Sequence, residues 1–259
     1  MTEKEYREHP GVNKSTLWEL RKSPLHYKYA LEHPQKDTPA LKFGRAFHMA
    51  VLQPEEFKKT YAVAPDIDRR TKQGKEEWQA FLDFYEGREI ITQDDYETII
   101  GMRDAVLNDP DAHYLLFGCQ TEVPVFWTDE ATGIECKCKI DACKQGVVID
   151  LKSCDNAETE AFKRAAKQYG YDAQCAHYLR GYRSKYGINA EWYFIAVEKK
   201  EPWAVNVIQV GDDFIDRGTW IIIDLMDKLK KCREQDQWPG YGKNKLILKE
   251  YETIPDDDE

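Results

Sequence analysis

Two charged side chains interrupt a strongly apolar run near the middle of the chain. In the run VVIDLKSC, Asp150 and Lys152 stand two residues apart among valine, isoleucine and leucine. Burying such a pair in a strand is costly unless the two charges are matched or used. The upstream segment ECKCKID adds a third charged candidate, Asp141. If the two segments pair through a short turn at 142–146, side-chain alternation places Asp141 and Asp150 close together.

This arrangement is compatible with phosphodiester hydrolysis. Two neighbouring carboxylates repel each other unless a cation lies between them, and an oxygen-rich site suits Mg²⁺. Lys152 could then orient or deprotonate a water, or neutralise charge on a phosphate. A salt bridge at the edge of a strand explains Asp150 and Lys152 equally well, because an acidic residue two places before a lysine recurs at 56–58, 135–137 and 198–200.

Two helical motifs add further polar candidates. The segment GRAFH carries Gly44 and His48 four residues apart, on one face of an expected helix. The segment YDAQCAHYLRGY carries Gln174 and Tyr178 at the same spacing, on the helix that follows the Asp150 strand. Taken alone, the histidine reads as structural, and the second pair reads as ordinary polar positions on an amphipathic helix.

The elements that must position these residues follow from periodicity and capping signals. We expect helices in the first third, including one after an N-cap at Asn13 or Ser15, one ended by Pro54, one from Lys75 to about Tyr85, and one capped by Thr92. Three strands at 121–129, 134–143 and 146–154 form an antiparallel meander. A long helical segment at 158–186, broken near Gly170, then precedes a hairpin at 190–210 and a last helix at 212–234. The order predicts one α/β domain over 1–259, with a mixed sheet flanked by helices.

Composition sets limits on the class of protein. The chain has 259 residues, of which 42% are hydrophobic and 12% aromatic, as expected for a globular protein. No apolar run approaches the roughly 20 residues that span a bilayer, and the polar N-terminus does not resemble a signal peptide, so we expect a cytoplasmic protein without a membrane contact. The seven cysteines form no C-x-x-C motif and are expected to be reduced.

Charge is unevenly distributed along the chain. The net charge of −10 disfavours a nucleic-acid partner on its own. However, an acidic tail from about residue 254, ending in DDDE, supplies part of it, and basic clusters occur at 69–75, 163–167 and 228–233. Each cluster taken alone reads as a solvated face.

Together, GRAFH, KCKID, VIDLK and QCAHY resemble a known nuclease pattern. Their order matches the motifs G-x-x-x-H, Asp, Asp-x-Lys and Q-x-x-x-Y of RecB-type nucleases in the PD-(D/E)XK superfamily. The closer likeness is to the C-terminal nuclease domain of the exonuclease VIII (RecE) family. It covers roughly residues 10 to 240, through VNKSTLWELRKSPLHY, LQPEEF, APDIDRRTKQGKEEWQAF, EATGIECKCKID and QWP.

The resemblance implies a role for each motif residue. It implies a metal held by His48, Asp141, Asp150 and the backbone carbonyl of Leu151, with Glu122 as a further candidate. Lys152 would act on the attacking water, and Gln174 and Tyr178 would position the phosphate or the lysine and water. The residues implied in contacts with the DNA backbone are Arg69, Arg70, Lys72 and Lys75.

The resemblance also implies an activity. Members of the family degrade double-stranded DNA from its ends with Mg²⁺, for which Mn²⁺ can substitute, in the 5′ to 3′ direction, leaving a 3′ single strand for recombination. They form rings around DNA and work with a single-strand annealing protein. Some wider relatives hold an iron–sulfur cluster, but no cysteine precedes Cys119 and only Cys232 follows Cys175, so no cluster is expected. An endonuclease or structure-specific nuclease of the same fold, and a non-catalytic DNA- or partner-binding module, remain as alternatives.

Overall fold

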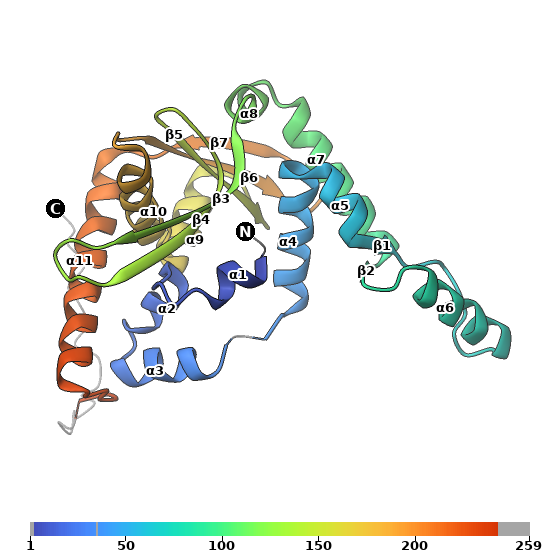
Figure 1. Ribbon diagram of the computed structural model, residues 1–259. Helices are drawn as coiled ribbons and strands as arrows, with labels where there is room; N and C mark the ends of the chain where they lie inside the picture. The colour runs from blue at the N-terminus through green and yellow to red at the C-terminus, as the bar shows by residue number, and fades with distance from the viewer. Residues whose placement is uncertain (1–2, 35, 243–259) are drawn as a thin grey trace, which may run out of the picture.

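The centre of the protein is a five-stranded mixed sheet (Figure 1). The computed structural model describes residues 3–34 and 36–242. The strand order follows the chain, and the β5–β6 pair is parallel whereas the other pairs are antiparallel. The strands are β3 (Gln120–Thr128), β4 (Glu135–Lys144), β5 (Val147–Cys154), β6 (Glu191–Glu198) and β7 (Val205–Gln209). The predicted meander, hairpin and mixed sheet are confirmed.

Helices cover both faces of the sheet. On one face, Ile149 and Leu151 of β5 pack into a core with residues of α4 and α7. On the other face, Val148 of β5 packs with residues of α9 and α10, and α11 lies against α10. These helices are α4 (Pro39–Leu52), α7 (Gln93–Asn108), α9 (Thr159–Tyr169), α10 (Tyr171–Tyr186) and α11 (Asp212–Gln235). The alternation of side chains along β5 therefore separates two cores.

The break between α9 and α10 lies at Gly170, as expected. Gly170 has φ +65°, and a Cβ atom there would lie 2.1 Å from the ring of Trp18. Glycine satisfies both the left-handed backbone and the close ring contact. The break lets α10 turn across the sheet and bring Gln174 toward β5.

The shorter helices refine the sequence expectation for the first half of the chain. They are α1 (Glu3–Glu8), α2 (Lys14–Glu19), α3 (Pro24–Glu32), α5 (Pro54–Thr60) and α8 (Pro110–Leu116). Asn13 caps α2 by accepting a hydrogen bond from the Thr16 N–H. Helix α4 ends at Leu52 and Pro54 begins α5, because proline is tolerated in the first turn of a helix.

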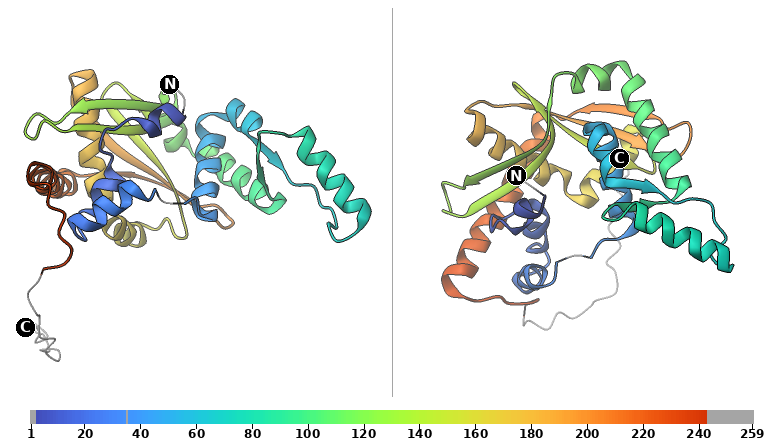
Figure 2. Two further views of the ribbon diagram at one scale, coloured as in Figure 1. Left: turned by 60° about the horizontal axis from the view of Figure 1, so that its bottom comes forward. Right: turned by 45° about the vertical axis from the view of Figure 1, so that its right-hand side comes forward.

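An arm extends from the body beyond the end of α5 and the start of α7 (Figures 1 and 2). Strands β1 (Tyr61–Val63) and β2 (Glu89–Ile91) pair in parallel, and α6 (Lys72–Phe84) lies between them. This two-stranded sheet was not expected from the sequence. Helix α6 begins three residues before the expected Lys75, because Thr71 caps it by accepting a hydrogen bond from the Gly74 N–H.

Two further sequence expectations concern the acidic tail and membrane spans. The acidic tail lies outside the described residues. Across residues 3–34 and 36–242, no helix combines the length and the apolar character that crossing a membrane requires.

Candidate metal centre and catalytic cleft

The site begins where strands β4 and β5 stop pairing. Their ladder ends with Ala142 opposite Ile149. Beyond it, the Leu151 N–H donates a 2.9 Å hydrogen bond to Oδ2 of Asp141. His48 Nδ1, from α4, lies 3.4 Å from the same oxygen. Where the two strands separate, the Asp141 carboxylate thus contacts both the Leu151 N–H and the His48 imidazole.

Glu122 on β3 completes a possible set of metal ligands. The pairs Thr121–Ala142 and Val123–Ile140 flank Glu122, which therefore lies opposite Asp141. Its φ is +52°. A non-glycine residue in this region is strained, and such strain concentrates at functional sites. One ligand atom from each of His48, Glu122 and Asp141 lies within 4.8 Å of the others. Glu122 Oε2 also lies 2.6 Å from Lys139 Nζ.

Asp150 is deeply buried beside this group and is held by two other residues. Its Oδ1 accepts a 2.5 Å hydrogen bond from Gln174 Nε2. Its Oδ2 pairs with the Lys152 ammonium, although without hydrogen-bond geometry, and has no hydrogen-bond partner in the described part of the chain. Asp150 therefore stands next to the three-residue ligand set with one incompletely satisfied buried oxygen.

The electrostatic environment separates the two aspartates. Burial raises the pKa of Asp150 to about 6, against the lowering effect of Lys152. Burial also acts to raise the pKa of Asp141, but His48, Lys152 and the Leu151 N–H lower it overall. The pKa of His48 is raised, because the attraction of Asp141 outweighs burial. At neutral pH, Asp141 is a carboxylate and His48 has an increased proton affinity.

Lys152 is a cation in this environment. Burial acts to lower its pKa, but Asp150 and Asp141 raise it overall. Its Nζ also lies 4.8 Å from the centre of the Tyr171 ring. Lys14 is a second amine close enough to be affected: its pKa is lowered to about 8, first by burial and then by the charge of Lys152. Lys14 Nζ donates a 2.6 Å hydrogen bond to the Tyr169 carbonyl.

Tyr178 lies one helical turn after Gln174 on α10. Burial raises its pKa well above the usual value, and the charges of Asp150 and Asp141 contribute to the rise. Its ring packs edge-on against Trp192, 5.8 Å between centroids. Tyr178 thus lies within electrostatic range of the carboxylates, as part of the core beside them.

A cleft of about 1180 Å³ opens onto His48, Glu122 and Asp141. Helices α1 and α4 and the base of the arm contribute its walls; the lining residues include Tyr6, Arg7, Gly44, Arg45, Tyr61 and Lys139. Lys137, only 4% exposed, fixes α1 to β4. Its Nζ donates to the carbonyl oxygens of Tyr6 (2.8 Å), Arg7 (3.1 Å) and His9 (2.6 Å).

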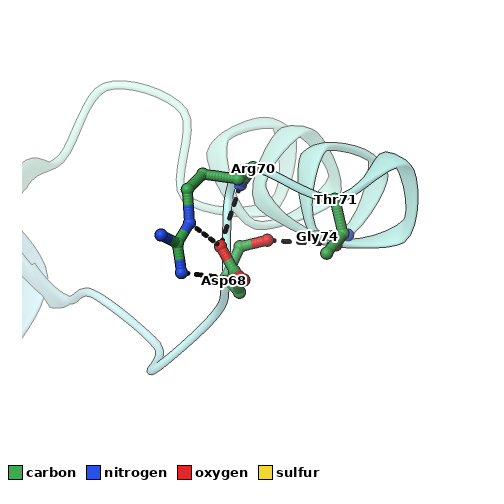
Figure 3. A network of polar contacts seen from close by, with 4 residues as sticks. All are labelled: Asp68, Arg70, Thr71 and Gly74. Atoms are coloured by element: carbon green, nitrogen blue, oxygen red, sulfur yellow. Dashed lines mark hydrogen bonds and ion pairs between the residues drawn. The ribbon is translucent and has the colours of Figure 1, made fainter.

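The four predicted DNA contacts do not join this site. Arg69, Arg70, Lys72 and Lys75 lie on the arm and do not line the cleft. Figure 3 shows Arg70 paired with Asp68, through bonds of 2.9 Å from Nε and 3.2 Å from Nη2. The Arg69 guanidinium stacks over Trp78 at 4.4 Å. All four side chains are exposed, and α6, which carries Lys72 and Lys75, lies in the arm away from the five-stranded sheet (Figure 1).

Sequence reasoning missed several charged residues around the site. Arg45 stands inside the GRAFH motif, one turn before His48, so its position could have been anticipated. Lys139 alternates with Asp141 along β4 and could also have been found. Lys14 and Lys137 reach the site region only through long-range packing, for which the sequence contains no signal.

The donor set fits a divalent cation. Carboxylate oxygens are the ligands that Mg²⁺ and Mn²⁺ prefer, and imidazole adds one softer donor. The buried Asp150 Oδ2, which has no hydrogen-bond partner among the described groups, is a further oxygen beside the set. His48, Glu122 and Asp141 could therefore hold a cation, with Asp150 adjacent.

Comparison with known proteins concerns the family and the fold. Residues 14–250 match the model of a family described as a PDDEXK-like domain of unknown function. The fold is similar to the crystal structure of a candidate exonuclease from Eubacterium rectale, with a TM-score of 0.64 and 14% identity, covering 98% of this chain and 96% of that one. A phage-related exonuclease from Haemophilus somnus 129PT is a more distant match, with a TM-score of 0.33 and 12% identity over 64% of this chain and 85% of that one. No curated protein matches the sequence.

Proposed function

Because this chain belongs to the PDDEXK-like domain family whose model it matches over residues 14–250, we propose that it is a metal-dependent nuclease acting on DNA. The observation that carries the proposal is the convergence of His48, Glu122 and Asp141 within 4.8 Å at a large cleft. Asp150, which contacts Lys152 and Gln174, lies within electrostatic range of Asp141 and His48. A structural salt bridge does not account for this collection of buried and half-buried polar groups.

Each residue has a distinct task in this proposal. His48, Glu122, Asp141 and Asp150, with the carbonyl of Leu151, hold Mg²⁺ or Mn²⁺. The bound cation supplies Lewis-acid polarisation of a phosphoryl oxygen.

Lys152 keeps a proton on Nζ at neutral pH, since its pKa is raised overall even though burial opposes the rise. It therefore places positive charge beside the phosphate that becomes more negative during attack by water. Gln174 fixes Oδ1 of Asp150, and Asp150 in turn fixes the Lys152 ammonium. Tyr178 supports this arrangement from the next turn of α10.

We further propose that the substrate is an end of duplex DNA, digested 5′ to 3′ to leave a 3′ single strand. The motif resemblance supports this finer assignment, and the exonuclease description of the Eubacterium rectale neighbour supports action at a DNA end. A ring of identical subunits and an annealing protein acting on the exposed strand would complete the system. In such a ring, the exposed cations of the arm would contact the DNA backbone.

A time course tests the assignment directly. Linear duplex DNA labelled at one end is incubated with and without Mg²⁺, beside a covalently closed circle. We expect progressive shortening of the linear substrate only with the metal, no cutting of the circle, and no activity in Asp150→Asn. Cutting of the circle would instead support an endonuclease. If the intact protein binds DNA but cuts neither substrate with Mg²⁺ or Mn²⁺, a binding module is the better description.

A further inference from the structure

One face of α4 lines the cleft, and three of its lining residues concern the chemistry of the site. Gly44, Arg45 and His48 all border the same 1180 Å³ space as Asp141. Positions 45 and 48 are three apart and therefore neighbours on the helix surface. The ligand set accounts for His48, whereas nothing described so far accounts for Arg45 or for a glycine at position 44.

Arg45 makes a two-pronged contact with one carboxylate. Its Nη1 donates to Asp37 Oδ1 at 2.7 Å, and its Nη2 donates to Asp37 Oδ2 at 2.9 Å. Glu89, at the base of the arm, lies 3.8 Å from the same Nη2. The side chains of Arg45, Asp37 and Glu89 are 31%, 42% and 47% exposed, so the whole group borders the solvent of the cleft.

The Asp37 carboxylate presents the same pair of oxygens that a phosphate would present. The guanidinium fork matches carboxylate and phosphate geometry equally well. An arginine–carboxylate pair that is open to solvent contributes little to stability, so a phosphate can displace Asp37 at little energetic loss. Arg45 thus lines the cleft, and Asp37 holds its guanidinium in an orientation that can also bind a phosphate of a DNA backbone.

Gly44 provides a second, independent indication of an incoming ligand. Glycine in the interior of a helix destabilises it relative to alanine. No heavy atom of the surrounding protein lies within 4 Å of where a Cβ would stand at Gly44, and its φ is not positive. The fold therefore does not require glycine here, whereas close approach of a ligand to α4 would.

We propose that Arg45 binds a DNA phosphate against the face of α4 where Gly44 allows close approach. Asp37 competes with that phosphate for the same guanidinium. The inference rests on the proposed function and deepens it by naming a substrate-binding residue next to the metal ligands. The phosphate is an internal phosphodiester or a terminal phosphate monoester; both have the oxygen geometry that the fork recognises.

Equilibrium binding tests this pairing without any cleavage step. The Kd of a fluorescein-labelled duplex is measured by anisotropy in Ca²⁺, for the intact protein, Arg45→Gln, Arg45→Lys, Asp37→Asn and the double variant Arg45→Gln/Asp37→Asn. We expect Arg45→Gln to raise the Kd about tenfold, with a salt dependence weaker by about one charge, and Arg45→Lys to give an intermediate value. Asp37→Asn should lower the Kd about threefold, because the competing carboxylate is removed.

The double variant separates competition from simple charge repulsion. If Asp37 acts through Arg45, the double variant has the Kd of Arg45→Gln alone. If Asp37→Asn still tightens binding without Arg45, the competition is refuted. Running each variant on duplexes with a 5′-phosphate and a 5′-hydroxyl shows the source of the phosphate: an equal effect on both indicates a phosphodiester, and an effect limited to the first indicates the terminal group.

A matched pair elsewhere serves as the control. Arg103 bonds to Asp104 on α7 with similar exposure, 27% and 49%, and neither lines the cleft. Arg103→Gln and Asp104→Asn should leave the Kd unchanged. An intact protein that binds DNA while Arg45→Gln binds equally well overturns this inference alone. An intact protein that binds no DNA overturns the proposed function as well.

Discussion

Gln174 and Asp150 are joined by a 2.5 Å hydrogen bond from Nε2 to Oδ1. The bond links α10 to the strand that carries Lys152, so it determines where both charged side chains of that strand point. Hydrogen bonding to a carboxylate favours its ionised form and lowers its pKa. Burial raises the pKa of Asp150 to about 6, and the bond from Gln174 acts in the opposite direction by stabilising the ionised carboxylate.

Replacing Gln174 by leucine should shift the pH dependence of activity. Without the donated bond, the pKa of Asp150 rises further above 6, so activity is lost at a higher pH as the solution is acidified. The measurement is the pH–rate profile of nuclease activity at a fixed Mg²⁺ concentration below saturation, where protons and the cation compete for Asp150. Gln168→Leu, at an exposed position on α9, is the control and should keep the original profile. An unmoved acid limb in Gln174→Leu would show that the bond is only structural.

Metal affinity should decrease as the pH is lowered. A cation must displace a proton from His48, whose pKa Asp141 raises against the effect of burial, and another from Asp150 below about pH 6. Each displaced proton makes the Kd rise about tenfold per pH unit. Calorimetric titration with Mn²⁺ between about pH 5 and about pH 8 measures the slope of log Kd for the metal against pH. His48→Gln should bind more weakly and lose the steepness near neutral pH; an affinity independent of pH would exclude both groups as ligands.

Gly44→Ala should stabilise the protein while weakening its interaction with DNA. The alanine side chain meets no protein atom, so the gain in helix propensity raises the free energy of unfolding by about 0.5–1 kcal/mol. Gly218→Ala is the contrasting variant, because its Cβ would lie 2.0 Å from the Asp172 carbonyl oxygen and should destabilise the packing of α11 on α10. Urea unfolding and DNA binding are measured on both variants. Unchanged DNA affinity in Gly44→Ala would contradict close approach to α4.

Glu122→Gly should be unusually well tolerated by the fold and poorly tolerated by the metal site. The φ of +52° suits glycine, so this variant should be about 1 kcal/mol less destabilised than Glu135→Gly, a control on the neighbouring strand. Mn²⁺ affinity should fall only at position 122. Equal stability losses in the two variants would argue that the backbone at Glu122 is not strained.

The cations of the arm should affect DNA binding through charge alone. Lys72→Gln/Lys75→Gln is expected to reduce the slope of log Kd against log salt by about two units, with little dependence on DNA sequence. Lys163→Gln/Lys167→Gln, which removes two exposed charges from α9, is the matched control. If both double variants give the same slope of log Kd against log salt, DNA does not contact the arm specifically.

The central part of the fold could be derived from the sequence because its signals are local. Alternation and a short turn were sufficient to place Asp141 and Asp150 on adjacent strands, and Gly170 marked the break that orients α10. Motif order then indicated the superfamily, which the family match confirms. Periodicity was enough to predict elements such as β4 and β5, because their pairing involves residues close together in the sequence.

Other features depend on contacts between distant segments. Strands β1 and β2 contain three residues each and pair across an intervening helix, so neither shows a usable pattern. The meeting of His48 with Asp141 followed from resemblance and not from periodicity. The left-handed backbone of Glu122 and the burial of Lys137 have no sequence signature, since glutamate and lysine are both typical of exposed positions.

The clamp of Lys137 on α1 has a practical consequence for preparing the protein. Because Lys137 holds the carbonyls of Tyr6, Arg7 and His9, the first turns of the chain are attached to the strand that carries Asp141. A purification tag or fusion partner at the N-terminus would sit beside the mouth of the cleft, where Tyr6 and Arg7 form part of the wall.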